Sequence, residues 1–414
     1  LKEAIKMIID VSAENFLSFN NKVTLSLIAN NTKGLENNYV KIDDKKIFKT
    51  AAIYGANASG KSNLFKIINL VAYMIQSSSD RDLNSKLSVV PNELNASDSF
   101  SSFEINFIKD GIRYYYGFKA NKDHIAEEFL YYYPNGRITT IFKRINEDYT
   151  FSKDNKLLKE IKNRNTPNKF FLSTATIWNY QKTKPAYDFL TKDIEVSFEI
   201  EEMRNRAFEI YYNDSGDLKA FALDFLKKAD LDIIDFETNV VDIPEYILSS
   251  IPDSLKELTN SKAYHTKFKH KANDKEYYLD FGVESNGTQV LFTLLPFIYN
   301  AIKNNGVLLI DELDKRLHPF LVEYIVNIFN DSDINKTNAQ LIFNTHDTNL
   351  LDLNVLRRDQ IWLTEKNYEN GSSELYSLGD FSLRNKENIE RGYLLGRYGG
   401  VPYIQKEINL WEEK

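Results

Sequence analysis

The stretch GANASGKS, residues 55–62, fits the pattern G-x-x-x-x-G-K-[S/T]. It follows an apolar run, IFKTAAIYG at 47–55, and precedes a segment with helical spacing of apolar residues at 61–76. The motif therefore lies between a predicted strand and a predicted helix, which is the context that it requires. A Gly-containing turn that arises by chance would not be expected to have both a strand before it and a helix after it. The stretch predicts a phosphate-binding loop (P-loop).

The residue types within this loop indicate how a nucleotide would be held. Gly55 and Gly60 let backbone N–H groups turn toward phosphates at the helix N-terminus. Lys61 can reach the β- and γ-phosphates, and Ser62 can coordinate Mg²⁺. The sequence has no Asn-Lys-x-Asp motif for guanine, so we expect ATP rather than GTP. ATP and Mg²⁺ are thus the expected ligands.

Two later apolar runs end in residues that suit hydrolysis. VLLIDE at 307–312 ends in Asp311, which can hold the Mg²⁺ water shell, and in Glu312, which can act as general base. LIFNTHD at 341–347 carries His346, which could donate to the γ-phosphate. A strand that simply ends at the surface, or a structural histidine, would explain each run alone. Together with the P-loop, they predict one site at a single edge of an α/β sheet.

A second Gly-containing turn, ESNGT at 284–288, precedes a helix-like run. Ser285, Gly287 and Thr288 place N–H groups and hydroxyls at a predicted helix start, where an anion can bind. An ordinary surface turn is the alternative interpretation. The turn lies between the P-loop and the acidic pair in sequence, so it is a candidate second half of the nucleotide site.

Bulk properties favour a folded protein outside the membrane. The chain has 414 residues, of which 43% are hydrophobic, and it has no Cys. The missing Cys residues exclude disulfides and thiolate zinc sites, and no apolar run is long enough to span a bilayer. We therefore expect a cytoplasmic protein with no membrane partner. A net charge of −7 does not support a dedicated nucleic-acid coat, although a local basic groove is compatible with it.

Hydrophobic periodicity divides the chain into three parts. Residues 1–76 and 270–414 alternate strand and helix patterns and predict one discontinuous α/β core. Residues 77–150 contain alternating runs broken by Asp110-Gly111 and Asn135-Gly136, which are hairpin-turn dipeptides, and predict an antiparallel β lobe. Residues 151–269 predict a mostly helical insertion.

The set of motifs resembles the ATP-binding-cassette (ABC) superfamily, in its intracellular branch related to the RecF and SMC ATPases. AENFLSF at 13–19, ESNGT at 284–288 and DELDKRLHP at 311–319 are similar to motifs of that branch. The resemblance implies an ABC-type P-loop ATPase head that hydrolyses ATP between two or more copies, with the Ser-x-Gly turn of one copy acting on the nucleotide of another. The glutamine expected between the P-loop and the insertion has Gln76 as its nearest candidate.

The resemblance carries roles onto matching residues. It implies that the catalytic residues are Glu312, His346 and Lys61. It implies that Mg²⁺ is held by Ser62 and Asp311. The nucleotide-binding set that it implies is Gly55, Asn57, Gly60, Lys61, Ser62, Asn63, Ser285, Gly287 and Thr288.

The C-terminal stretch DFSLRNKENIERGYLLGRYGGVPYI, residues 380–404, resembles the tail of bacterial AAA-family ATPases in abortive-infection and other anti-phage systems. That resemblance implies a separately encoded effector, often a Toprim-type nuclease, and a trigger derived from the phage. The alternative is a RecF-like ATPase of DNA repair or DNA-end binding, with basic segments at 164–169 and 268–271 as candidate DNA contacts.

Two further patterns suggest a metal or nuclease site only weakly. Asp230 and Asp232 form an Asp-x-Asp pair, and His265 and His270 lie close in sequence. Neither pattern has an accompanying second ligand cluster, so we interpret the aspartates as part of a solvated face.

Overall fold

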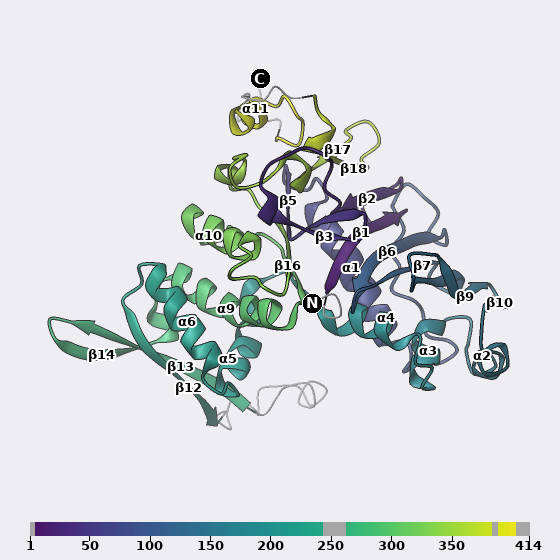
Figure 1. The fold of residues 1–414 in the computed structure, drawn as a ribbon, viewed down its shortest axis with the longest axis horizontal. Coiled ribbons are helices and arrows are strands. Elements are labelled where there is room, and N and C mark those ends of the chain that lie inside the picture. The colour runs from purple at the N-terminus through teal and green to yellow at the C-terminus, as the bar shows by residue number, and fades with distance from the viewer. Residues whose placement is uncertain (1–4, 243–261, 383–387, 403–414) are drawn as a thin grey trace, which may run out of the picture.

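Two β-sheets organise the protein. The computed structural model describes residues 5–242, 262–382 and 388–402 of the chain. A six-stranded sheet lies at the centre, and a seven-stranded antiparallel sheet forms a lobe beside it (Figure 1). Within the described ranges, smaller sheets of three and two strands complete the β structure. This is the mixed α/β architecture that the sequence predicts.

The central sheet is parallel except at one edge. Each of its first five strands pairs in parallel with its neighbour, and β18 is antiparallel to β17. The carboxyl ends of the parallel strands therefore meet at one edge of the sheet. In spatial order the strands are β11 (Ile194–Ser197), β15 (Val307–Ile310), β16 (Gln340–Asn344), β5 (Thr50–Gly55), β17 (Ile361–Lys366) and β18 (Ser373–Ser377).

The antiparallel lobe is built from successive hairpins. Asp110 and Gly111 both have positive φ, 53° and 73°, as a two-residue hairpin turn requires, and Asn135-Gly136 lies between two further strands. In spatial order the strands are β10 (Asp148–Thr150), β9 (Thr139–Ile145), β8 (Ile125–Tyr133), β7 (Ile112–Ala120), β6 (Ser101–Lys109), β1 (Lys6–Glu14) and β2 (Val23–Ser26). The separate two-stranded sheet consists of β3 (Tyr39–Ile42) and β4 (Lys45–Phe48).

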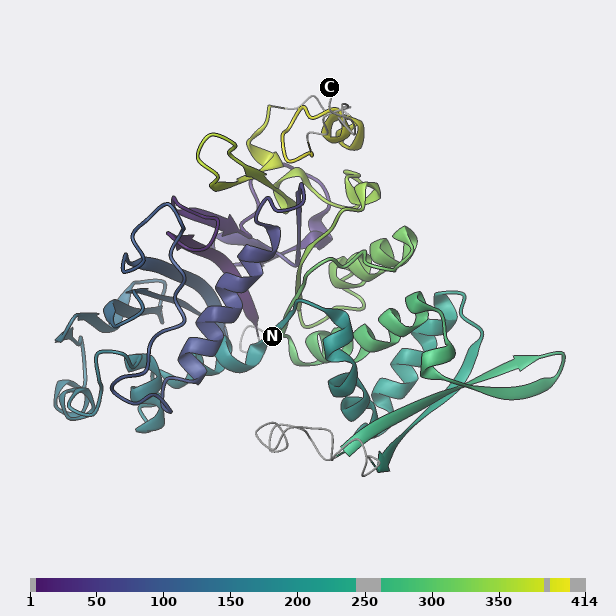
Figure 2. The same cartoon turned by 180° about the vertical axis from the view of Figure 1, so that it is seen from behind.

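Helix α1 (Lys61–Gln76) lies between the two large sheets, with bounds that match the predicted helix. Its apolar face packs in one core cluster with the antiparallel sheet and with one face of the central sheet, and Figure 2 shows the helix running along the antiparallel lobe. Strand β5 contributes to both cores, because Ala51 and Ile53 point into this cluster and Ala52 and Tyr54 into the second one. The strand before the P-loop is thus buried on both faces.

The second core covers the opposite face of the central sheet. It is formed by α5 (Arg204–Tyr212), α6 (Asp217–Lys228), α9 (Asn286–Asn304) and α10 (Pro319–Asn330). The three-stranded sheet extends away from these helices (Figure 1) and consists of β12 (Ile233–Asp242), β13 (Lys262–Ala272) and β14 (Lys275–Asp280). No helix within the described ranges has the length and apolar composition needed to cross a bilayer.

Residues 151–269 are only partly helical. They contain α2 (Asn155–Lys162), α3 (Phe171–Ile177), α4 (Lys184–Asp188), α5 and α6, but also β11, β12 and most of β13. β11 has four residues and forms an edge of the central sheet through its pairing with β15. So short a run carries too little periodicity to identify a strand from sequence. The domain boundaries drawn from the sequence therefore stay a prediction.

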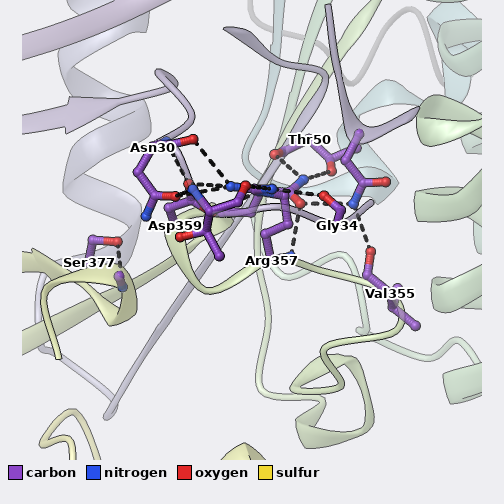
Figure 3. Close-up of polar contacts among 11 residues, drawn as sticks. Asn30, Gly34, Thr50, Val355, Arg357, Asp359 and Ser377 are labelled. Atoms are coloured by element: carbon purple, nitrogen blue, oxygen red, sulfur yellow. Dashed lines mark hydrogen bonds and ion pairs between the residues drawn. The ribbon is translucent and has the colours of Figure 1, made fainter. Parts of the chain in front are cut away.

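A buried arginine just before β17 forms hydrogen bonds with the segment after β2. The Arg357 guanidinium donates to the carbonyls of Thr32 and Gly34 at 2.7 and 2.8 Å, and it contacts both carboxylate oxygens of Asp359 at 3.0 Å (Figure 3). Asn30 accepts a further bond at 3.1 Å. Because both charges are buried, each depends on the other for compensation.

Gln360 extends this network to the start of β5. Its amide nitrogen donates to the Thr50 carbonyl at 2.9 Å, and its amide oxygen accepts from Asn38 at 2.8 Å. Asn38 also donates to the Val355 carbonyl at 2.9 Å (Figure 3). The amino ends of β5 and β17 are thus held together by buried amides, which fixes their register.

Arg357→Ala should destabilise the fold by about 3–5 kcal/mol, because it leaves the Asp359 carboxylate buried without its partner. Urea unfolding followed by circular dichroism measures this change. Arg137→Ala is the matched control, since Arg137 is exposed and its loss should cost less than about 0.5 kcal/mol. Equal midpoints for the two variants would contradict the assigned role of Arg357.

Candidate functional site

The P-loop leaves β5 at Gly55 and enters α1 at Lys61. The Lys61 ammonium folds back over the loop and donates to the carbonyls of Gly55 at 2.8 Å and Ala56 at 3.1 Å. Burial lowers its pKa, while nearby carboxylates, Asp311 first among them, oppose that shift. Asn57 lies exposed at the tip of the loop. Gly60 caps α1 without a side-chain hydrogen bond, so this helix N-terminus keeps donors for an anion.

Residues outside the sequence motif support the loop from both sides. The Ser59 hydroxyl hydrogen-bonds to the Thr364 hydroxyl on β17 at 2.6 Å. Asn63 donates to the Ser18 hydroxyl at 2.8 Å, and the Ser18 carbonyl accepts from the Ser373 backbone N–H at 2.7 Å. The N-terminal turn and β18 therefore both reach the P-loop. Sequence reasoning missed Thr364 and Ser373 because they become neighbours of the loop only through sheet pairing.

The acidic pair stands next to the P-loop. Ser62 donates to an Asp311 carboxylate oxygen at 3.1 Å, which brings the two predicted Mg²⁺ ligands together. Asn344, at the end of the adjacent β16, donates its amide to the same Asp311 oxygen and accepts the Glu312 backbone N–H at 2.6 Å. Glu312 is exposed and has a φ of 53°, in the left-handed region. Asn344 is a site residue that the sequence interpretation did not identify.

His346 follows β16 at the same edge of the sheet. Its backbone N–H donates to both carboxylate oxygens of Asp314 at 3.2 Å. Partial burial lowers the pKa of the imidazole, and the Lys61 charge lowers it further, while Asp314 acts in the opposite direction. These shifts favour the neutral ring, which keeps one N–H donor. P-loop, acidic pair and His346 therefore occupy one edge, as the motif order predicts.

The ESNGT turn begins α9. The Ser285 hydroxyl accepts the Thr288 backbone N–H at 3.1 Å and caps the helix, and Ser285 is exposed while Thr288 is buried. A Cβ on Gly287 would lie 3.0 Å from the Arg316 carbonyl, so the turn packs closely on the loop after the acidic pair. In the described part of the chain, no hydrogen bond or ion pair joins Ser285–Thr288 to the P-loop.

The P-loop side of the site fits a magnesium-bound nucleotide. A Ser hydroxyl and an Asp carboxylate are hard oxygen donors of the kind that Mg²⁺ selects, and they lie at the N-terminus of a 16-residue helix. The Lys61 ammonium, which donates to two loop carbonyls in this structure, can turn to a phosphate. Ser62 and Asp311 would hold the metal, which would neutralise phosphate charge.

Gln76 does not fit a role at this site. It is the last residue of α1, so a helical rise of about 1.5 Å per residue places it roughly 20 Å from Lys61. The Asp-x-Asp pair, Asp230 and Asp232, is exposed after α6, in agreement with a solvated face. Gln76 was the nearest match in sequence, but the straight helix separates it from the phosphates.

Each histidine of this pair contacts one carboxylate. His265 contacts Asp280 at 3.1 Å, and His270 contacts Glu284 at 2.6 Å. Among the described residues, no group of three or more His, Cys, Asp or Glu side chains could hold a metal ion. In the candidate DNA segments, Lys269 pairs with Glu276, and Arg164 stacks on Trp178.

Comparisons with known proteins agree with the P-loop architecture. The family model described as "AAA domain, putative AbiEii toxin, Type IV TA system" matches residues 51–352, which is more than half of the chain and includes the P-loop, the acidic pair and His346. No curated protein matches the sequence.

Several solved SMC head structures resemble the chain at low identity. One, titled as an SMC head bound to the C-winged helix domain of ScpA, has 14% identity and a TM-score of 0.43, covering 89% of this chain and 97% of its own. The SMC head domain from Thermotoga maritima has 13% identity and a TM-score of 0.40, covering 89% and 98%. An SMC head from Pyrococcus furiosus has 12% identity and a TM-score of 0.40, covering 95% and 99%.

Gly55→Ala should weaken nucleotide binding at least about tenfold, because the new Cβ would lie 2.3 Å from the Thr364 hydroxyl and 2.5 Å from its carbonyl. The loop must then move away from β17. Titration with a fluorescent ATP analogue measures the affinity. Gly282→Ala is the control, since nothing lies within 4 Å of a Cβ there. Wild-type affinity in Gly55→Ala would show that this close approach is not needed for binding.

Proposed function

The chain belongs to the AAA-domain family described as putative AbiEii toxin of a type IV toxin–antitoxin system, and on this premise we propose that it is an ATP-hydrolysing switch of a bacterial anti-phage defence system. One observation carries the proposal: the Ser62 hydroxyl donates to an Asp311 carboxylate oxygen at 3.1 Å, beside Lys61 and Glu312. Phosphate binding, metal binding and water activation need these residue types in one place.

Each residue has a defined part in hydrolysis. Lys61 turns from the loop carbonyls to the β- and γ-phosphates, and Ser62 with Asp311 holds Mg²⁺. Glu312 accepts a proton from the attacking water as general base. His346 donates to the γ-phosphate through its neutral ring. Asn57 and Asn63 line the nucleotide, and Asn344 orients the acidic pair through its bonds to Asp311 and Glu312.

The site needs a second copy of the chain. Ser285 is exposed and caps α9, and among the described residues its hydrogen bonds go to Thr288 of the same turn. We place Ser285, Gly287 and Thr288 of one copy on the phosphates held by Lys61 of the other. ATP would then join two copies, and hydrolysis would release them. Each copy contributes both halves, so a symmetric pair forms two equivalent sites.

The switch acts on a separate protein in this proposal. The resemblance of residues 380–404 to the tail of anti-phage ATPases supports an effector encoded elsewhere, for which a Toprim-type nuclease is our candidate. The family description adds a toxin–antitoxin context. A phage-derived trigger would favour or end the ATP-joined state, and that state would hold or release the effector.

Glu312→Gln should trap the ATP-joined oligomer, because the amide cannot accept the proton while Asp311 and Lys61 still bind the nucleotide. Light scattering with ATP and Mg²⁺ measures the mass, and turnover should fall by at least about a hundredfold. Lys61→Ala is the control that should stay unassembled. A mass for Glu312→Gln that ATP leaves unchanged would argue against assembly on the nucleotide.

Mixing two inactive variants tests action between copies. Lys61→Ala and Ser285→Arg should each lose turnover alone, yet a mixed pair contains one site with both Lys61 and Ser285 intact. Random pairing should restore about a quarter of wild-type activity, since half the pairs are mixed and half of their sites are whole. Phosphate release measures the recovery. No recovery from a mixture in which light scattering shows that mixed pairs form with ATP would place Ser285 outside the partner's site.

A further inference from the structure

The C-terminal segment, residues 388–402, returns to the phosphate edge of the central sheet. It contains α11 (Ile389–Leu394), followed by a turn at Gly399-Gly400, and Figure 1 places α11 near β17. The segment is firmly packed, because Ile389, Tyr393 and Tyr398 are all at least nine-tenths buried in the second core. It contacts elements on both sides of the nucleotide site.

One set of contacts reaches the start of the P-loop. The Tyr393 ring packs edge-on against Tyr54, the residue before Gly55, with ring centroids 5.7 Å apart. The Tyr393 hydroxyl donates to the Gly400 carbonyl at 3.0 Å, and a Cβ on Gly400 would lie 3.7 Å from the Gly55 Cα. The Gly400 backbone therefore packs against the first residue of the P-loop.

Another set of contacts reaches the loop that carries His346. The Thr348 hydroxyl donates to a Glu390 carboxylate oxygen on α11 at 2.8 Å. Tyr54 donates its buried hydroxyl to the Asp347 carbonyl at 2.9 Å. Asp347 is thus hydrogen-bonded to β5, and Thr348 is hydrogen-bonded to the C-terminal segment. The placement of the partly buried His346 imidazole, directly before them, depends on this backbone.

We propose that Glu390 is a positioning residue for hydrolysis: through Thr348 it holds the His346 loop at the γ-phosphate position, while Tyr393 and Gly400 hold α11 against the P-loop. The inference rests on the proposed ATPase function and extends it to a segment outside residues 51–352 of the family match. Glu390 acts through its bond to Thr348. It acts on the orientation of His346 and not on the affinity of the P-loop for ATP.

If Glu390 acts on His346 and not on ATP affinity, its loss should lower kcat and leave KM for ATP nearly unchanged. Glu390→Ala and Thr348→Val each remove one partner of the same bond and should lower kcat about tenfold, the rate equivalent of one charge-assisted hydrogen bond. KM for ATP should change less than about twofold, because Lys61 and Ser62 are untouched. The double variant should be no slower than either single variant, since both lose one shared interaction.

Two further variants separate positioning from general damage. Glu390→Gln keeps an oxygen acceptor for Thr348 and should recover most of the rate. Leu394→Ala changes a residue on the same helix that is 61% exposed, and it should match wild type. Thermal unfolding of each variant checks folding, and Thr348→Val, which adds no charge and keeps the side-chain volume, carries the test if Glu390→Ala does not fold.

The outcomes distinguish this inference from the function that it rests on. The positioning role would be overturned if Thr348→Val and Glu390→Ala both turned over ATP at the wild-type rate, as Leu394→Ala should. That result would leave the ATPase proposal standing. A loss that appears in KM alone, or additive losses in the double variant, would also overturn it. Absence of ATP turnover in the wild type would overturn both. A shared loss in kcat with recovery by Glu390→Gln supports the inference.

Discussion

The side chain of Asn344 joins the two strand ends on which the site depends. Its amide nitrogen bonds to Asp311, and its amide oxygen accepts the N–H of Glu312, whose backbone lies in the left-handed region. A non-glycine residue keeps that conformation only where its surroundings hold it. Asn344 also accepts the Leu313 N–H through its carbonyl at 3.1 Å. The acidic pair is therefore shaped by the neighbouring strand as much as by its own.

Parallel pairing makes this arrangement available. Ile310 pairs with Phe343 and Asn344 with Ile53, so β15, β16 and β5 end within a residue or two of each other. Everything that follows a strand end then falls on the same edge: the acidic pair, the His346 loop and the P-loop. On the other side, β17 aligns Thr364 with Gly55 and supplies the hydroxyl that holds Ser59. The buried amides of Gln360 and Asn38 fix that alignment from the far end of the sheet.

Local patterns predicted what depends on neighbours in sequence. The P-loop has its motif, α1 has its apolar spacing and the hairpin at Asp110 has its dipeptide, and each agrees with the structure. Contacts that form only on folding could not be predicted from the sequence. Asn344 and Thr364 belong to no motif, and β11 is too short to show a hydrophobic periodicity. Gln76 illustrates the opposite error, since it is close in sequence but separated from the phosphates by the length of a helix. The roles of Ser285 and Gly287 stay predictions, because they require a second copy of the chain.

The position of the C-terminal segment gives the proposed switch a direct physical route to its surroundings. Tyr54 lies on the strand before the P-loop, bonds to the Asp347 carbonyl and packs on Tyr393, so one buried side chain connects that strand with the His346 loop and α11. Close-packed interiors do not deform gradually, and a shift of the His346 loop on phosphate release must be taken up by the groups packed on it. Glu390 bonds to that loop directly, and Tyr393 packs on Tyr54, whose hydroxyl bonds to the Asp347 carbonyl. A change at the γ-phosphate would thus reach the surface of α11, where Leu394 and Leu395 are exposed, without passing through the rest of the fold.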